Sequence, residues 1–371
     1  MNRRKFIGTV SGTIIATGTT VYLLSDKRNL SRAEIKTAVD KNTFLKPDET
    51  EILFLASLAP SGHNTQPWLV KYLTPYHWII GNDQRKWLPA VDPNQRETML
   101  SIGAFLQNLE YAANSFGFGC DWNLLAKTNQ DDKIIEVKLI KKEIKTRFDI
   151  AKIKDRRTVR SGFINDVLKK EDVEYLVNSE SEFLHYFPIT SNESRFISEQ
   201  TIEANRLQTY RDPAQQELAE WIRFSSKDAD KYRDGLTTAS MEIEGVPGWM
   251  VRNFYGKDDV LKTHFREKGL EKVKEQVSKS AGWILITSKD ESVATLLETG
   301  KRMQRLFLKV REKNLGIHPM TQILEEPSTK QILNQSIGIR DNVQFILRTG
   351  YLKNYPPPVS LRRPVAWFVD A

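Results

Sequence analysis

Apolar and polar residues alternate along the chain in patterns that predict helices and short strands. The helix predicted over residues 97–116 has one apolar face, made of Ile102, Phe105, Leu109, Ala112 and Phe116. An earlier helix is predicted to begin at Pro47, because a proline followed by Asp48 and Glu49 suits a helix start. Other helices are predicted over residues 172–177 and 294–313, and much of residues 192–278. Short strands are predicted over residues 68–73, 77–81, 134–140, 183–189, 282–287, 343–350 and 365–369.

The two halves of the chain carry similar patterns. The segment Gly103–Gln107 matches Gly300–Gln304, and Phe116-Gly117-Phe118 matches Leu315-Gly316-Ile317. The offset between the copies stays at 197 to 199 residues across a helix and the glycine that ends it. Two copies indicate an internal duplication rather than a longer repeat array. We expect the two long helices to pack together where their glycines let the backbones approach.

Composition excludes several classes of protein. Apolar residues make up 40% and charged residues 27% of the 371 residues, as in ordinary globular proteins. Cys120 is the only cysteine, so there is no internal disulfide, and without a Cys/His cluster we expect no metal site. The net charge of +8 is spread along the chain rather than concentrated, which argues against nucleic-acid binding.

The N-terminus has the pattern of an export signal. Arg3 and Arg4 precede Phe6 and an apolar run that ends at Leu24, as in twin-arginine signals. This predicts a periplasmic or otherwise exported protein. The run from residue 6 to residue 24 is 19 residues long, enough to span a bilayer, so an uncleaved membrane tether stays open as an alternative to cleavage. We exclude residues 1–26 from the fold.

A polar loop is predicted between the first helix and the first strand. Its sequence is Ala-Pro-Ser-Gly-His-Asn-Thr-Gln-Pro-Trp over residues 59–68. The candidate binding residues here are Ser61, Gly62, Asn64 and Gln66, which offer a hydroxyl, amides and backbone N–H groups in a short arc. Such groups suit a flat heterocycle with alternating donors and acceptors.

Two arginine-containing segments are candidate anion sites. The first runs from Asp155 to Phe163 and includes Arg156, Thr158 and Arg160. The second, near the C-terminus, places Arg362 and Arg363 between prolines. Guanidinium groups match phosphate oxygens in pairs, although clustered surface arginines are often merely solvated.

The order of these motifs resembles the nitroreductase superfamily of FMN-dependent proteins. In that family an arginine segment and a C-terminal basic segment hold the FMN phosphate, and a Pro-Ser-x-x-Asn-x-Gln-Pro-Trp loop from the partner subunit holds the ring. The resemblance covers roughly residues 47–371, with Thr158 where the family usually has serine. It implies an α+β fold of two fused halves, each with a mainly antiparallel sheet flanked by helices.

The chain departs from the family because each motif occurs in only one half. The resemblance therefore implies one complete FMN site per chain, a monomeric pseudo-dimer, and a pattern similar to the Acg-like branch. We expect a first half over residues 30–150 and a second half over residues 151–371, with a helical insertion over residues 192–278. Residues 237–256 are the candidate lid, because glycines and prolines flank large apolar side chains there.

The resemblance implies a hydride transfer from a reductant such as NAD(P)H through FMN to a nitro-type or quinone-type small-molecule acceptor. The alternative is a non-catalytic protein that binds and sequesters FMN beneath a closed lid. No catalytic side chain can be assigned from the sequence. His63 and His318 are candidates to lie beside the ring, with surface or packing roles as the alternatives.

Overall fold

The computed structural model describes residues 25–26, 32, 44–144 and 146–371. The predicted signal over residues 1–26 therefore lies outside the described residues, apart from Ser25 and Asp26. Within the part of the chain that is described, no helix combines the length and apolar character needed to cross a bilayer.

The first half is an antiparallel sheet with two helices. Its elements are α2 (Pro47–Ser57), η2 (Gly62–Asn64), β1 (Trp68–Thr74), β2 (His77–Asn82), η3 (Gln84–Lys86), α3 (Arg96–Ser115), β3 (Phe118–Leu124) and β4 (Lys133–Lys141). The strands of this half lie in the order β1-β2-β4-β3. The buried, mostly apolar α3 packs against this sheet, and its neighbour α2 buries Ile52 and Leu55.

The second half repeats this plan. Its elements are α4 (Ala151–Asp155), α5 (Lys170–Val177), η4 (Asn178–Glu180), β5 (Leu184–Pro188), β8 (Gly282–Ser288), α12 (Val293–Val310), η5 (Arg311–Lys313), β9 (Leu315–Pro319), α13 (Gln322–Glu325), α14 (Pro327–Ile337) and β10 (Asn342–Tyr351). Its strands lie side by side in the order β5-β8-β10-β9, which matches the order β1-β2-β4-β3 of the first half. Along the chain, α3 and α12 each connect the second strand of their half to the third. The structure thus has the predicted α+β architecture with two similar, mainly antiparallel sheets.

The two long helices cross at their glycines, as the repeat predicted. A Cβ atom on Gly103 would lie 2.1 Å from the backbone oxygen of Leu297, and one on Gly300 would lie 2.0 Å from that of Leu100. Only glycine allows such an approach. The matching glutamines lie in the same interface, where Gln304 donates to Asn108 at 2.7 Å. The pseudo-dimer is therefore built around the α3–α12 pair.

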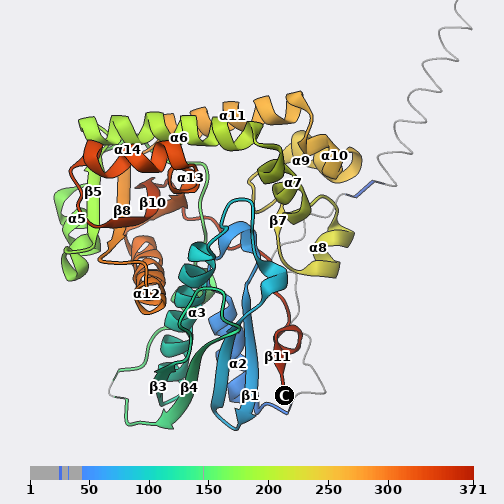
Figure 1. The fold of residues 1–371 in the computed structure, drawn as a ribbon, viewed down its shortest axis with the longest axis vertical. Coiled ribbons are helices and arrows are strands. Elements are labelled where there is room, and N and C mark those ends of the chain that lie inside the picture. Colours follow the sequence, from blue (N-terminus) through green and yellow to red (C-terminus); the bar gives the residue numbers. More distant parts are fainter. Residues whose placement is uncertain (1–24, 27–31, 33–43, 145) are drawn as a thin grey trace, which may run out of the picture.

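The insertion joins β5 to β8 and forms a helical layer above the second sheet (Figure 1). It contains α6 (Asn192–Tyr210), α7 (Asp212–Trp221), β6 (Ile222–Arg223), α8 (Ser226–Tyr232), β7 (Leu236–Thr237), α9 (Gly245–Phe254), α10 (Lys257–Val260) and α11 (Thr263–Ser278). Helices α6 and α11 lie side by side across the top of the molecule, whereas α7 to α10 extend over the first half (Figure 1).

The C-terminal segment returns to the first half. Strand β11 (Val369–Asp370) pairs in parallel with β1, next to η6 (Val365–Trp367). The sequence predicted one strand over residues 365–369, but most of that stretch forms the single turn of η6 and only its last residue enters β11. This return of the C-terminal segment brings Arg362 and Arg363 beside the loop that follows α2.

Candidate functional site

The polar loop between α2 and β1 has an unusual backbone. His63, Asn64 and Gln66 have φ angles of 47°, 56° and 57°, in the left-handed region that non-glycine residues seldom adopt. The Ser61 hydroxyl accepts a hydrogen bond from the Gln66 N–H at 3.0 Å, which tightens the turn. Strained conformations of this kind persist where surrounding contacts hold them, and they often mark functional sites.

The two amide side chains of the loop hold it to neighbouring segments. Asn64 is buried, and its amide donates to the backbone oxygens of Gly235 and Leu361 at 3.1 and 3.2 Å. Gln66, also buried, donates to the Arg233 oxygen at 2.9 Å and accepts from the Arg363 N–H at 2.9 Å. Both amides were predicted to contact a ligand, whereas here they contact the protein itself.

The C-terminal arginines complete the same network. Arg362 donates to the Asn64 side-chain oxygen at 2.8 Å and to the carbonyl oxygens that end α2, including that of Ser57 at 2.6 Å. Its side chain is buried, and burial lowers its pKa well below the ordinary arginine value. Arg363 donates to the backbone oxygens of Gln66 and Trp68. These two arginines therefore hold the loop and the end of α2.

Arg156 lies beside this network with donors to spare. One of its terminal nitrogens donates to the Leu58 oxygen at 3.3 Å, an oxygen that Arg362 also contacts. Its Nε and Nη1 atoms are buried and have no partner among the described residues. Burial lowers the pKa of Arg156 to about 10, and among the described residues its side chain donates only to a neutral carbonyl. A buried guanidinium with unused donors is suited to an anion.

A cavity of about 380 Å³ lies between the halves, next to the loop. Four of the predicted residues line it: Ser61, Gly62, Thr158 and Arg160. His63 and His318 line it too. The other five predicted residues are not part of the cavity lining and lie behind the residues that line it. They are Asn64, Gln66, Arg156, Arg362 and Arg363. The structure thus gathers all nine in one region, although their contact with a cofactor stays a prediction.

Helices of the insertion cover the cavity. Gln208 of α6, Gln215 of α7 and Gln276 of α11 line it, together with apolar residues of α11. None of residues 237–256, all of which are described, is part of the lining. The predicted lid segment has another contact instead, because Glu242 accepts hydrogen bonds from Arg157 and from the Arg160 N–H at 2.9 and 3.0 Å. It therefore supports the arginine segment from outside the cavity.

The two histidines of the cavity are neutral at physiological pH. Burial, reinforced by the nearby charge of Arg160, lowers the pKa of His63 to about 4. Burial and the charges of Arg348 and Arg160 lower the pKa of His318 well below its usual value. The Nδ1 atom of His318 is buried and has no partner among the described residues. It can therefore accept from or donate to a molecule in the cavity.

The cavity also has an acidic wall that the sequence did not reveal. The carboxyl groups of Glu97 and Glu325, one from each half, line it and lie close enough to affect each other's pKa. Gln208 donates to Glu325 at 2.5 Å, and Arg96 donates to Glu97 at 3.1 Å. Burial raises the pKa of both carboxyl groups. Glu97 appeared in the sequence only as an acidic residue at a helix start.

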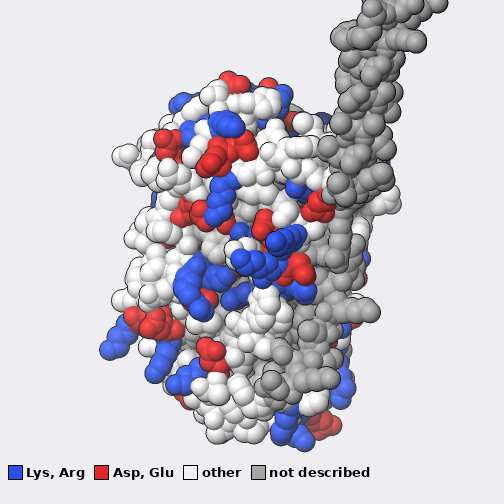
Figure 2. Space-filling view, turned by 90° about the vertical axis from the view of Figure 1, so that its right-hand side faces the viewer, with Lys and Arg blue, Asp and Glu red and all other residues white. Residues whose placement is uncertain are grey.

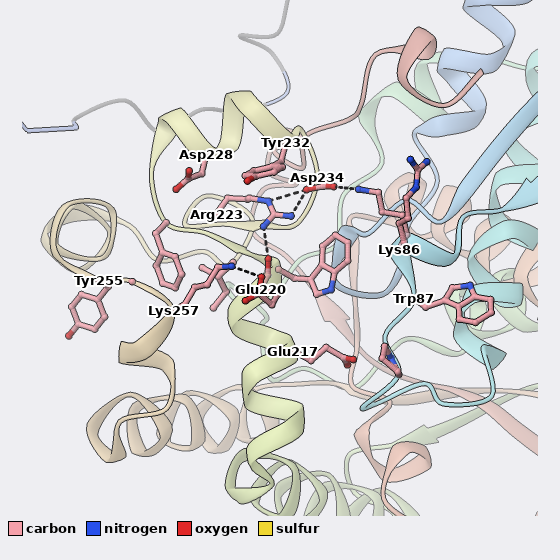
Figure 3. Close-up of a pocket in the computed structure, with 16 residues that line it drawn as sticks. Lys86, Trp87, Glu217, Glu220, Arg223, Asp228, Tyr232, Asp234, Tyr255 and Lys257 are labelled. Carbon is pink, nitrogen blue, oxygen red and sulfur yellow. Dashed lines mark hydrogen bonds and ion pairs between the residues drawn. The ribbon is translucent and has the colours of Figure 1, made fainter. Parts of the chain in front are cut away.

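A second pocket, of about 750 Å³, is lined by residues of the insertion and by residues 85–87 and 89 of the first half (Figure 3). Asp234 points into it and forms ion pairs with Arg223 and Lys86 at 2.5 and 2.6 Å, while Lys257 pairs with Glu220 (Figure 3). The surface on the side of α8 and β11 likewise shows basic and acidic side chains interleaved (Figure 2). Paired charges of this kind stabilise the insertion against the first half and indicate no particular ligand.

The second half has no equivalent of the cavity loop. At the corresponding place after α5, Glu180 forms ion pairs with Arg302 and Arg305 at 2.5 and 2.7 Å. The Arg302 guanidinium also lies 3.9 Å from the centre of the Phe183 ring. Side chains of the protein thus occupy the place where a second copy of the loop would lie.

Comparison with known proteins gives relatives of one kind. No family model matches the chain. A curated relative, "Probable NAD(P)H nitroreductase PigM" of Serratia sp., is 22% identical over 331 residues, which cover 84% of this chain and 90% of the relative. The chain is similar to proteins of the nitroreductase superfamily.

Solved structures of this superfamily show a weaker likeness. A protein from Anabaena variabilis described as a nitroreductase covers 88% of this chain and 94% of its own length, at 12% identity and a TM-score of 0.38. The FMN-dependent nitroreductase NfnB from Mycobacterium smegmatis, solved with NADPH, covers 56% of this chain and 95% of its own length, at 14% identity and a TM-score of 0.35.

Proposed function

We propose that this chain is an FMN-binding oxidoreductase that passes hydride from NAD(P)H through the flavin to a nitro-type or quinone-type acceptor. The observation that carries the proposal is the cavity between the halves that Ser61, Gly62, Thr158 and Arg160 line. Its volume of about 380 Å³ is in the range of ligand sites. The nitroreductase relative named above supports the same reaction class.

The donors at this cavity fit FMN. Arg160 and the hydroxyls of Ser61 and Thr158 offer charge and hydrogen bonds at one wall. Behind this wall, Arg156 has two buried donors without a partner among the described residues, and they add positive charge on the same side. His318 offers an unpartnered ring nitrogen to the polar edge of the flavin. These side chains would hold the cofactor from both halves of the chain.

FMN, when bound, supplies the hydride chemistry, and the protein supplies binding and orientation. Asn64, Gln66, Arg362 and Arg363 keep the loop in its strained conformation, which sets the positions of Ser61 and the backbone N–H groups. Helices α6, α7 and α11 of the insertion line the cavity on the side away from the loop and restrict access to it. Since residues 237–256 line no part of it, the structure offers no specific support for sequestration beneath that segment.

The absorption spectrum of the purified protein, followed by anaerobic addition of NADPH, tests the proposal. We expect a flavin spectrum that bleaches. We also expect Arg160→Ala to weaken FMN binding by about 1.5–3 kcal/mol, the scale of a charge-assisted hydrogen bond. Arg206→Ala is the control, because Arg206 pairs with Glu203 on the exposed side of α6 and should leave the affinity unchanged. A colourless protein that takes up no added FMN would exclude the proposal, and a flavin that NADPH does not bleach would favour sequestration.

We further propose that the chain is exported by the twin-arginine route and works as a monomer, with halves over residues 30–150 and 151–371. The paired Arg3 and Arg4 and the duplicated fold support this. Replacing both arginines with lysine should keep the protein in the cytoplasm of a fractionated cell. Unchanged export would refute the route.

A further inference from the structure

Helix α9 exposes a row of large apolar side chains. Val246, Met250 and Phe254 are 69%, 43% and 56% exposed, and their spacing of four residues places them on one face of the helix. Each of the other described helices exposes at most one large apolar side chain to a comparable degree. We call these three residues the α9 stripe. A contiguous apolar stripe on a soluble surface marks a site of contact.

The opposite face of α9 is fixed to the protein. A Cβ atom on Gly248 would lie 2.2 Å from the backbone oxygen of Ile243, and Val251 packs against the small core formed by Ile222 and Val260. Because this inner face is already packed, the helix cannot turn the stripe inward without breaking these contacts. The stripe is therefore a built feature of the surface.

The N-terminal segment reaches the protein body at this same helix. The Trp249 indole donates to the Ser25 hydroxyl at 2.9 Å, and the Asp26 N–H donates to the Asn253 side chain at 2.7 Å. The Asp26 carboxylate in turn accepts from the backbone N–H of Ser226 at 2.6 Å, at the start of α8. Ser25 and Asp26 are thus held at α8 and α9 by several hydrogen bonds.

The sequence that immediately precedes Ser25 is the apolar run over residues 6–24, which contains no charged residue. A run of this length and character is able to enter a bilayer. Ser25 directly follows this run in the sequence, and its hydroxyl is hydrogen-bonded to Trp249 of α9. A bilayer that receives the chain up to residue 24 therefore has its surface within one residue of Ser25, and so close to the α9 stripe.

We propose that the α9 stripe rests on the lipid surface, so that the protein body is oriented on the membrane by two contacts, the apolar run and α9. The stripe would enter the boundary between headgroups and acyl chains, as apolar faces of interfacial helices do. Because the run keeps α9 close to the bilayer, the weak affinity of three side chains is sufficient for stable contact.

The test uses the full-length protein with vesicles of phosphatidylcholine and phosphatidylglycerol that carry brominated acyl chains. A polarity-sensitive dye is attached at Met250→Cys or, as the matched control, at Ile332→Cys on α14, both in a Cys120→Ser background. Ile332 is 42% exposed, close to the 43% of Met250, and lies on α14, at the opposite end of the helical layer from α9 (Figure 1). Circular dichroism checks that each labelled protein is folded.

We expect the bromines to quench the dye at position 250 severalfold more than the dye at position 332. Replacing Val246 and Phe254 with serine should reduce the quenching at position 250, although the apolar run is intact. Equal quenching at the two positions would indicate non-specific adsorption and overturn the proposal. Absence of quenching at position 250 would overturn it as well, whether the protein floats with the vesicles or stays in solution, and would point to another protein as the occupant.

Discussion

The two halves share one scaffold and differ in what connects it. In the first half, β1 and β2 are joined by the tight turn at Pro75 and Tyr76, whereas β5 and β8 are joined by the long insertion. The first half keeps a strained polar loop after its first helix, and the second half fills the same place with Glu180 and its arginine partners. Duplication thus preserved the sheets and the α3–α12 crossing, while one half came to supply the loop and the other its cover.

The crossing of the halves is the feature most sensitive to substitution. Gly103→Ala places a methyl group 2.1 Å from a backbone oxygen of α12, and we expect a loss of about 3 kcal/mol or more, or failure to fold. Gly269→Ala in α11 is the control, since a Cβ there meets no atom within 4 Å, and it should stabilise the protein by about 0.5–1 kcal/mol. Thermal unfolding measures both. Similar effects of the two substitutions would contradict the close packing of the halves.

The loop of the first half depends on Asn64. Asn64→Ala removes two donated hydrogen bonds and leaves Arg362 without one acceptor, so we expect a loss of about 2–3 kcal/mol. The matched residue after α5 is Asn178, which is exposed, and Asn178→Ala should have little effect. Chemical denaturation compares the two, and equal losses would show that the loops of the two halves are not distinct.

The acidic pair of the cavity should make stability depend on pH. Burial and repulsion from Glu97 raise the pKa of Glu325 well above its ordinary value, so the folded state binds a proton that the unfolded state releases. The contribution of this proton is fully present below the unfolded pKa and is lost as the pH rises through the folded one. Glu325→Gln should therefore flatten the decline in unfolding free energy above about pH 5. A decline as steep as in the parent protein would place its origin elsewhere.

The ion pairs of the second half should have the smallest effect. Arg305→Ala removes contacts with Glu180 and Glu298 that are partly exposed, so we expect a loss of about 1 kcal/mol in stability. FMN affinity should not change, because Arg305, Glu180 and Glu298 are not part of the cavity lining. Weaker flavin binding in an equilibrium titration would mean that the second half takes part in the site at this position.

Periodicity predicted the scaffold well because the long elements bury one face. The predicted helices over residues 97–116 and 294–313 correspond to α3 and to α12 with η5, and Gly103 and Gly300 meet as expected. Strands β3 and β9 were missed because each offers little alternation: β3 directly follows Gly117, and β9 itself contains Gly316, which the sequence suggested as a helix end. The short turn of η6 was taken for strand because its apolar residues have no helical repeat to show.

The sequence predicted which segments meet at the candidate site but not which side chains contact one another there. The motifs located the loop and both arginine segments, yet Asn64 and Arg362 satisfy each other, which only the return of the C-terminal segment makes visible. Glu325 and Gln208 could not be foreseen, because their meeting depends on how the insertion folds back over the cavity. The covering helices were likewise misassigned to residues 237–256, where glycine and large apolar residues mark the exposed α9 rather than a lid.

The return of the C-terminal segment to β1 also determines when the first half can be completed. Leu361, Arg362 and Arg363 hold the loop, and β11 closes the edge of the first sheet. When only the first half has been synthesised, the β1 edge of its sheet is therefore unpaired, and the loop lacks its hydrogen bonds to residues 361–363. The cavity loop can be fastened only after residues 361–370 have been synthesised, so a cofactor that depends on this loop must be captured after that point.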